Sequence, residues 1–254
     1  ANSIINCFDE EVLSNYKFPD SDEMWRFDIC LLKERKEYSK ASAKYFLAYI
    51  GNLFELLQWL FGFENLLIGI KKGSKKIFKV MDKIINYNIK TMDIFSNYGI
   101  HGVLMDDDWG TQRALMISPK IWRRYFKPAY KKIINEAKKR KLHFHFHTDG
   151  NVIEIIEDLI EIGVDVINPQ LSAVNIEKLS NICKDKVCII TDIDKQYILP
   201  YASTIEVIDY VKKVIELFGT DKGGLILRGE INSDSKLENI KEMYESFEEF
   251  GKII

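Results

Sequence analysis

Residues 142–150 read LHFHFHTDG and carry three of the chain's four histidines at two-residue spacing: His143, His145 and His147. Side chains alternate across a β-strand, so a strand here places all three imidazoles on one face. Two neighbouring imidazoles on that face, ~6–7 Å apart at Cα, can reach one metal ion. The turn Thr148-Asp149-Gly150 adds a carboxylate just beyond the last histidine. The stretch therefore predicts a strand that ends in a metal-binding turn. The alternative is a polar column inside a barrel, in which each histidine pairs with a neighbour.

The composition predicts one domain over residues 1–254, with residues 1–43 as a helical lead-in. A chain of 254 residues that is 46% hydrophobic can bury a core of barrel size. The net charge of −2 and the dispersed basic residues argue against nucleic acid as a partner. The four cysteines lack the spacing of a metal finger or a disulfide framework, which favours a reducing cytoplasm. No apolar run approaches the ~20 residues that cross a bilayer, so no membrane segment is expected.

From residue 45 onward, strand and helix patterns alternate about six times. Short apolar runs predict buried strands at 45–51, 102–107, the histidine stretch, 164–168, 187–191 and 224–228. Helical spacing and cap residues predict helices at 23–43, 52–60, 74–98, 119–140, 151–162 and 174–183. Capping boxes at Ser203/Glu206 and Ser235/Glu238 predict two more helices, the first ending near residue 218.

Strands that are apolar throughout predict a parallel sheet covered by helices, which is an α/β fold. A closed (β/α)8 barrel and an open doubly wound sheet both satisfy this pattern. Polar residues at the ends of successive strands favour the barrel, because all strand ends of a barrel meet at one mouth. No GxGxxG or GxxxxGK loop follows a strand, so a nucleotide-binding sheet has no local support. A barrel of this kind needs eight strands, so two are altered, unrecognised or precede residue 1.

Three stretches resemble the uroporphyrinogen decarboxylase superfamily, which includes corrinoid-linked and coenzyme M methyltransferases. They are DDDWGTQRALMISPKIWRRYFKPAYKKI at 106–133, HTDGNVIEIIEDLIEIGVDVINPQ at 147–170 and TDIDKQYILPYAS at 191–203. The segments at 54–67 and 223–234 are also similar to this family. The resemblance implies a (β/α)8 barrel with its site at the carboxyl ends of the strands.

The methyltransferase branch implies a zinc ion held by a His-x-Cys pair and a later cysteine. His147 matches the histidine, Asp149 stands at the first cysteine, and Gly229 stands at the second with Glu230 beside it. The resemblance thus implies a zinc site of His147 and Asp149, completed by Glu230, His145 or water. Such a site activates a small thiol or similar acceptor for methyl transfer from a corrinoid carried by a partner protein.

Two other functions stay open. The decarboxylase branch implies an arginine-rich N-terminal segment that grips the carboxylates of a porphyrin precursor, but residues 1–22 contain no arginine. Its histidine near the last strand is replaced by Arg228-Gly229-Glu230. Despite these two departures from the branch, decarboxylation of uroporphyrinogen or a related acid, using Asp107 and no metal, is kept as an alternative. The second alternative function is that of a barrel that binds a corrinoid protein or a ligand without turnover.

The remaining candidate residues stand at predicted strand ends. Asp107, Asp192 and His147 are candidate catalytic residues, although helix capping also explains Asp107 and loop capping also explains Asp192. The candidate substrate-binding residues are Gln112, Trp109, Asn168 and Arg228. Trp109 packing within its loop, Asn168 shaping its loop and Arg228 pairing with an aspartate are the structural alternatives. Tyr45 is expected in the core, and His101, at the start of a strand, is expected to serve stability.

Overall fold

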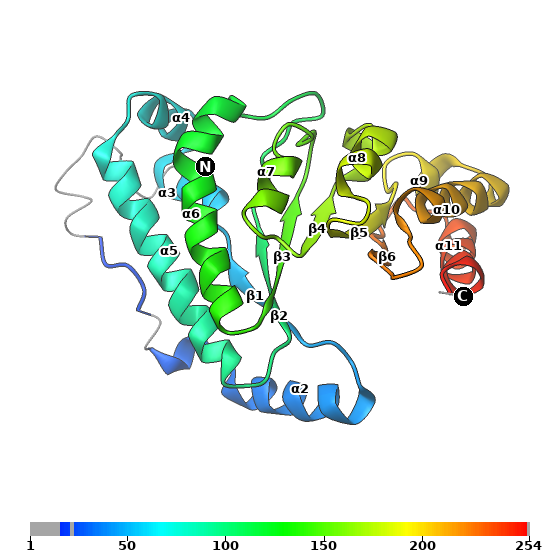
Figure 1. Cartoon of the computed structure of the whole chain (residues 1–254), viewed down its shortest axis with the longest axis horizontal. Helices are drawn as coiled ribbons and strands as arrows, with labels where there is room; N and C mark the ends of the chain where they lie inside the picture. Colours follow the sequence, from blue (N-terminus) through cyan, green and yellow to red (C-terminus); the bar gives the residue numbers. More distant parts are fainter. Residues whose placement is uncertain (1–15, 21–22, 253–254) are drawn as a thin grey trace. The chain divides into compact units, whose positions relative to one another are not determined.

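The computed structural model describes residues 16–20 and 23–252 (Figure 1). Six strands are present in this part of the chain: β1 (Leu47–Gly51), β2 (Gly102–Asp106), β3 (His143–Thr148), β4 (Val166–Pro169), β5 (Cys188–Ile193) and β6 (Leu225–Gly229). The longer helices are α2 (Ile29–Ser42), α3 (Phe54–Phe61), α4 (Phe63–Lys71), α5 (Lys75–Ser96), α6 (Pro119–Lys139), α8 (Ile176–Cys183), α10 (Thr204–Phe218) and α11 (Leu237–Phe250). The short helical segments are η1 (Met24–Arg26), α7 (Ile156–Glu161), η2 (Leu171–Ala173) and α9 (Ile198–Tyr201).

The strands form a parallel sheet in the order β1-β2-β3-β4-β5-β6. Parallel neighbours require a crossover, and helices supply it between successive strands. The predicted α/β fold class is therefore confirmed, while closure of the strands into a barrel stays a prediction. The described residues fall into two compact units, one up to Asp108 with 117–145, the other 109–116 with 146–252. Each unit is described by itself, and the single-domain assignment stays a prediction.

In the first unit, α5 and α6 pack side by side, and α5 also packs on β1 (Figure 1). The start of α6 follows from its sequence, because Ser118 Oγ accepts the Ile121 N–H and Pro119 occupies the first helical position. The apolar side of α6 is fully buried at Trp122, Phe126 and Tyr130. These large aromatic side chains give the unit much of its core.

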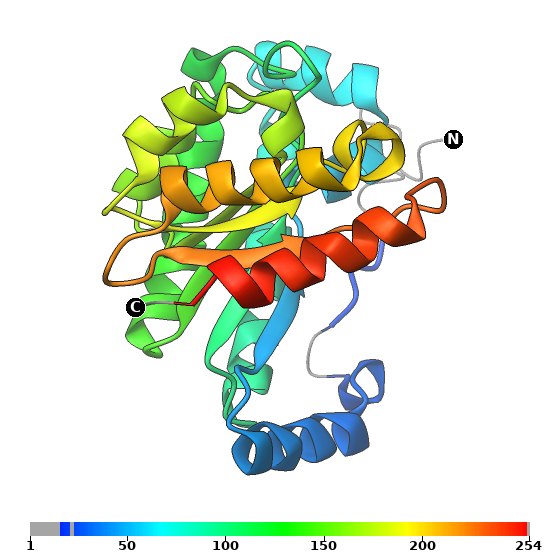
Figure 2. The ribbon, with the colours of Figure 1, turned by 90° about the vertical axis from the view of Figure 1, so that its right-hand side faces the viewer.

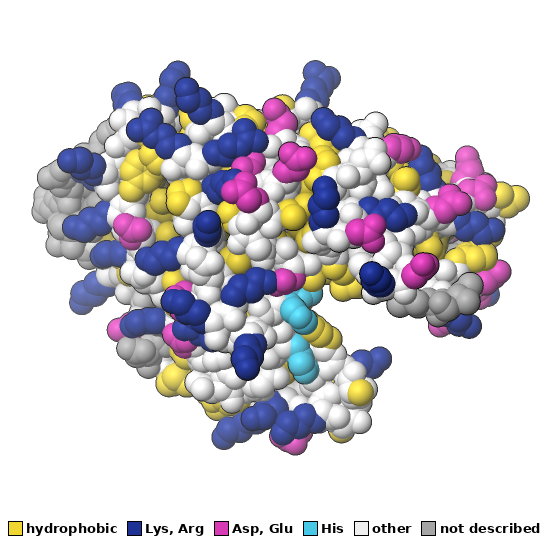
Figure 3. Space-filling view, viewed as in Figure 1, with side chains coloured by type: hydrophobic (Ala, Val, Ile, Leu, Met, Phe, Trp, Pro, Cys, Tyr) yellow, Lys and Arg dark blue, Asp and Glu magenta, His cyan; other side chains and the backbone are white. Residues whose placement is uncertain are grey.

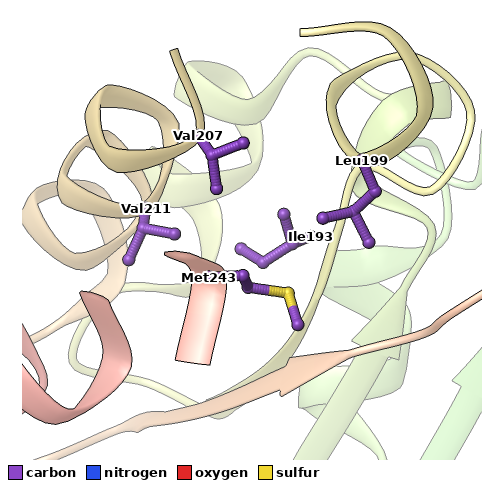
Figure 4. Packing of buried hydrophobic residues seen from close by; sticks show 5 residues of the cluster. All are labelled: Ile193, Leu199, Val207, Val211 and Met243. Atoms are coloured by element: carbon purple, nitrogen blue, oxygen red, sulfur yellow. The ribbon is translucent and has the colours of Figure 1, made fainter. Parts of the chain in front are cut away.

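In the second unit, α10 and α11 lie side by side and pack on β5 and β6 (Figure 2). Their shared core contains fully buried residues from β5, α9, α10 and α11 (Figure 4): Ile193, Leu199, Val207, Val211 and Met243. Gly229 belongs to this arrangement, since a Cβ atom there would overlap the thioether of Met243. The predicted capping box of α10 is confirmed, because Ser203 and Glu206 bond each other's backbone N–H.

Three local predictions were wrong, and one helix was missed. No Ser235 capping box forms: α11 has Lys236 as N-cap, and Ser235 Oγ has no hydrogen-bond partner among the described residues. The helix predicted at 151–162 shortens to α7, because residues before Ile156 form turns. The helix α4 after Gly62 was not predicted. Tyr45 is 47% exposed and not in the core, because it lies before β1 with its hydroxyl bonded to histidines.

The predicted lead-in helix over 23–43 corresponds to η1 and α2, while residues 1–15 and 21–22 lie outside the described residues. Only Ser39 is buried along α2, so this helix contributes little to the core. Within the described residues, no helix combines the length and the apolar character that a membrane crossing requires.

Candidate functional site

The turn at the end of β3 is held by the backbone of the loop 109–116. Trp109 N–H donates to Thr148 Oγ1 (3.2 Å), and Gly110 N–H donates to the carbonyl oxygen of Asp149 (3.0 Å). Gly110 and Gly150 face each other so closely that a Cβ atom on Gly150, whose φ is +81°, would overlap the Gly110 backbone. The chain can therefore adopt this turn only with glycine at both positions, and the turn sets where His147 and Asp149 lie.

The amide of Asn168, at the end of β4, is the centre of a hydrogen-bond network. Its Oδ1 lies 2.8 Å from His147 Nδ1 and accepts from Arg228 Nη1 at 3.2 Å. Its Nδ2 donates to the carbonyl oxygen of Ile190 and to Asp192 Oδ2, each at 3.0 Å. The donors and acceptors around Asn168 fit only one orientation of the amide. Asn168 is 3% exposed, so these bonds form away from bulk water.

This network determines which nitrogen of His147 carries a proton. Asn168 Oδ1 can only accept, so Nδ1 of His147 is the protonated nitrogen. In the neutral imidazole, Nε2 then holds the lone pair. Nε2 lies 3.6 Å from Asp149 Oδ1, which is also an electron-pair donor. Two electron-pair donors at this distance repel each other unless a positive charge lies between them. A proton on Nε2, or a cation bound by both His147 Nε2 and Asp149 Oδ1, makes the arrangement favourable.

Charged side chains at and just beyond the carboxyl ends of β5 and β6 lie near this pair. Lys195 Nζ lies 2.6 Å from Glu230 Oε1 and 3.9 Å from Asp149 Oδ2. Burial of Lys195 disfavours its charge, but the hydrogen bond to Glu230 and the charges of Asp149 and Glu230 prevail and raise its pKa. Arg228 Nε lies 3.3 Å from Asp192 Oδ1, and Arg228 Nη2 lies 3.9 Å from Glu230 Oε2. The strand ends of the second unit thus present two cations and three carboxylates.

Lys195 was not among the residues chosen from the sequence. It follows β5 within the stretch TDIDKQ at 191–196, where the sequence drew attention to Asp192 and Asp194. Asp194 in fact caps the following turn, since Oδ1 accepts from the N–H groups of Gln196 and Tyr197. The position of Lys195 immediately after a strand end was the only available signal.

Two candidate substrate-binding residues lie in the loop 109–116. Gln112 is exposed, whereas Trp109 is fully buried. The complete burial of Trp109 agrees with the structural alternative, a packed loop tryptophan. Gln170, after β4, supports the β3 turn, because its Oε1 accepts the Gly150 N–H at 2.9 Å. The substrate-binding roles of Gln112 and Trp109 stay predictions.

Asp107, in the first unit, has the contacts of a helix cap. Its carboxylate accepts from the backbone N–H of Leu53 (2.8 Å) and Glu55 (2.9 Å) at the start of α3, and from the Tyr130 hydroxyl (2.7 Å). Asp107 is completely buried. Burial raises its pKa to about 7, against the opposing effect of the three hydrogen bonds. These contacts match the helix-capping alternative, and a catalytic role stays a prediction.

His145, a candidate metal ligand, also lies in the first unit. Its Nε2 is 3.1 Å from the Tyr45 hydroxyl, which is 3.0 Å from His143 Nδ1 as well. The two-residue spacing on β3 therefore does place these two imidazoles on one face, where they meet the same side chain. A role of His145 as a ligand beside His147 stays a prediction.

The fold and the site define an α/β protein whose polar and charged side chains gather at the carboxyl ends of parallel strands. The family model "Uroporphyrinogen decarboxylase (URO-D)" matches residues 46–250. The chain therefore belongs to the uroporphyrinogen decarboxylase family, a family of enzymes, as its resemblance had implied. A comparison with curated protein sequences gives no match.

Solved structures give further similarities. A methyltransferase from Methanosarcina mazei superposes with a TM-score of 0.76 and 15% sequence identity, over 99% of this chain and 72% of that chain. The IOLI protein with a bound zinc atom gives a TM-score of 0.48 and 11% identity, over 90% of this chain and 83% of that chain. The 3-keto-D-glucoside 4-epimerase YcjR from E. coli gives a TM-score of 0.46 and 14% identity, over 85% of this chain and 82% of that chain. At these identities the first match shows a shared fold, and the other two scores are too low to support an argument.

Proposed function

We propose that this protein is a zinc-dependent methyltransferase that moves a methyl group between a corrinoid on a partner protein and a small acceptor. Membership of the uroporphyrinogen decarboxylase family and the fold shared with a methyltransferase support this reaction class. The observation that carries the proposal is the geometry of His147 and Asp149. Their facing electron pairs, 3.6 Å apart, are a donor set that a divalent cation would join.

The neighbours of His147 fit the same proposal. Histidines that bind metals usually form a hydrogen bond through the other ring nitrogen, which fixes the ring and its tautomer. The bond from Nδ1 to Asn168 has this arrangement, since it leaves Nε2 as the donor to metal. Asp192 and Arg228 hold Asn168 from the other side and act as positioning residues.

For the third ligand we propose Glu230 or water. Glu230 follows β6, in the same unit as His147 and Asp149. Glu230, the candidate taken from the sequence, forms an ion pair with Lys195, which would have to open before Glu230 could bind zinc. Carboxylate oxygens together with one imidazole are acceptable zinc ligands.

The bound zinc would act as a Lewis acid that lowers the pKa of an acceptor thiol and supplies a nucleophile at neutral pH. The chain's own residues have separate tasks. Arg228 is 48% exposed at its side chain, so its guanidinium can bind an anionic group of the acceptor. Lys195 balances the charge of Glu230 and Asp149. Gln112, on the exposed loop, offers an amide to the substrate.

The test is elemental analysis of untagged protein purified without chelators. We expect about one zinc per chain in the wild type, and its loss in His147→Ala. Asp149→Asn should also lose zinc. Glu230→Gln should weaken zinc binding if Glu230 is the third ligand, and should leave it unchanged if water is. His101→Asn is the matched control, because it removes an imidazole elsewhere and keeps a hydrogen-bond acceptor for Phe46 N–H.

Demethylation of methylcobalamin by a small thiol such as coenzyme M, followed by visible absorption, gives the second readout. The wild type and His101→Asn should show zinc-dependent turnover, and His147→Ala should not. A folded wild type that binds no zinc would contradict the proposal and leave a decarboxylase or a non-catalytic binding protein.

A further inference from the structure

The hydroxyl of Tyr45 lies between two imidazoles of β3 in the first unit. Its oxygen is 3.0 Å from His143 Nδ1 and 3.1 Å from His145 Nε2. The tyrosine ring stacks against that of His143, with an interplanar angle of 9°. Histidine side chains reach the surface next to one another on the face that Figure 3 shows. His143 itself is exposed, so solvent species have access to this cluster.

Gly102 is what permits Tyr45 to reach β3. Tyr45 precedes β1, and β2 separates β1 from β3 in the sheet order. A Cβ atom on Gly102, at the start of β2, would overlap the Tyr45 hydroxyl and lie 2.9 Å from the carbonyl oxygen of His143. The phenol therefore occupies the space that a side chain on β2 would otherwise fill.

The Tyr45 oxygen lies at the spacing of neighbouring ligands from each of the two imidazole nitrogens. Donors 3.0 and 3.1 Å apart that each bind an ion at about 2.0–2.1 Å subtend about 90–100° at that ion. This angle is nearer to the right angle of tetragonal coordination, which Cu²⁺ and Ni²⁺ adopt, than to the tetrahedral geometry of zinc. Imidazole nitrogens suit the same two metals, and Cu²⁺ is the tightest binder of the divalent series.

We propose that Tyr45, His143 and His145 form a second metal site, selective for a tetragonal divalent ion of the copper type. The ion binds through Tyr45 Oη, His143 Nδ1 and His145 Nε2. The phenol proton passes to solvent on binding, and water completes the coordination. The oxidation state of the metal does not change in this step.

His101 belongs to the same cluster but is not a ligand. Its ring lies 5.2 Å from that of Tyr45, yet its Nδ1 accepts the backbone N–H of Phe46 at 2.9 Å. That bond occupies the electron pair of Nδ1 and places the proton of a neutral His101 on Nε2. Neither nitrogen then has an electron pair available for a metal ion. His101 therefore offers a control variant within the cluster that should leave the metal affinity unchanged.

The experiment is a Cu²⁺ titration of the full chain in the His147→Ala background, with glycine as a competing chelator to suppress weak surface binding. We expect one Cu²⁺ per chain, electron paramagnetic resonance with coupling to two nitrogens, and a visible phenolate-to-copper absorption band. Tyr45→Phe should abolish that band and weaken the affinity at least 10-fold. His143→Ala should weaken the affinity at least as much and remove one nitrogen coupling. His101→Asn should bind like the background protein.

Gly102→Ala supplies an independent test, because it keeps all three donor side chains in the sequence but puts a methyl group where the Tyr45 hydroxyl lies. It should reproduce the loss of the absorption band seen in Tyr45→Phe, in protein shown to be folded by circular dichroism. If Gly102→Ala does not fold, Tyr45→Phe decides, since it removes one hydroxyl from a half-exposed ring. Cu²⁺ affinity that Tyr45→Phe and His143→Ala leave unchanged would overturn the proposal, as would the absence of binding.

Discussion

The buried carboxylate of Asp107 should make the protein less stable as the pH rises from about 4 to about 7. The pKa of Asp107 is about 7 in the folded chain and 3.8 as a free side chain. Between these values the folded state holds a proton that the unfolded state has released. Proton binding then favours the folded state, and this contribution is lost as the pH rises through the folded pKa. A carboxylate stabilised by ion pairs behaves in the opposite way.

The size of the effect follows from the same two values. A difference of about 3 pKa units corresponds to about 4 kcal/mol, at about 1.36 kcal/mol per unit. Asp107→Asn resembles the protonated acid but cannot accept both backbone N–H groups of α3. It should therefore lose about 1–3 kcal/mol at low pH, from the N–H that it leaves without an acceptor. That loss should shrink or reverse by pH 8, because only the wild type has to give up a proton.

Denaturant unfolding of both proteins, measured at steps from pH 4 to pH 8, tests this prediction. The quantity to follow is the difference in unfolding free energy, wild type minus variant, because titrations of other groups cancel in it. The difference should fall with rising pH by up to about 4 kcal/mol. A difference that stays constant, or that grows with pH, would refute the reasoning and show that hydrogen bonds outweigh burial at Asp107.

Three further predictions concern single side chains. Tyr130→Phe removes the hydroxyl 2.7 Å from Asp107, so we expect a loss of about 1.5–3 kcal/mol at pH 8 by denaturant unfolding and a smaller loss at pH 4; equal losses would speak against an ionised Asp107. Asn168→Leu releases the ring of His147, and zinc affinity measured by competition with a chelator should weaken about 10–100-fold; unchanged affinity would mean that Asn168 does not orient a ligand. Met243→Ala empties part of a fully buried cluster and should cost about 2–5 kcal/mol in the same unfolding assay, whereas a loss below about 1 kcal/mol would show that the cluster collapses around the cavity.

Local signals in the sequence predicted the six strands and each of the longer helices except α4. Most strands are short apolar runs and β3 alternates histidine with phenylalanine, both of which are local patterns. Caps such as Ser118-Pro119 and Ser203/Glu206 also act within one helical turn. The same kind of signal failed at Ser235. There Lys236 N–H is bonded to the carbonyl oxygen of Leu199, and α11 begins one residue later than the capping box requires. A contact from a distant segment decided the outcome.

The candidate site shows the same limit. The spacing within HTDG identified His147 and Asp149, and strand ends identified Asn168, Asp192 and Arg228. Sequence could not show that Asn168 bonds four partners at once, because those partners come from three other strands. It also could not bring Tyr45 to histidines about a hundred positions away, since that contact depends on the absence of a side chain at Gly102.

The close approach of Gly110 and Gly150 has a consequence for protein engineering. The two backbones leave no room for a methyl group, and a Cβ on Gly110 would come within 2.5 Å of Asn151 N. The HTDG turn and the loop that opens with Trp109 can therefore be transplanted to another scaffold only as a pair. A library that randomises one segment and holds the other fixed would retain glycine at the varied position, whatever chemistry it was selected for. Variants that change the reaction should instead be sought at Gln112, whose side chain is exposed on the same loop.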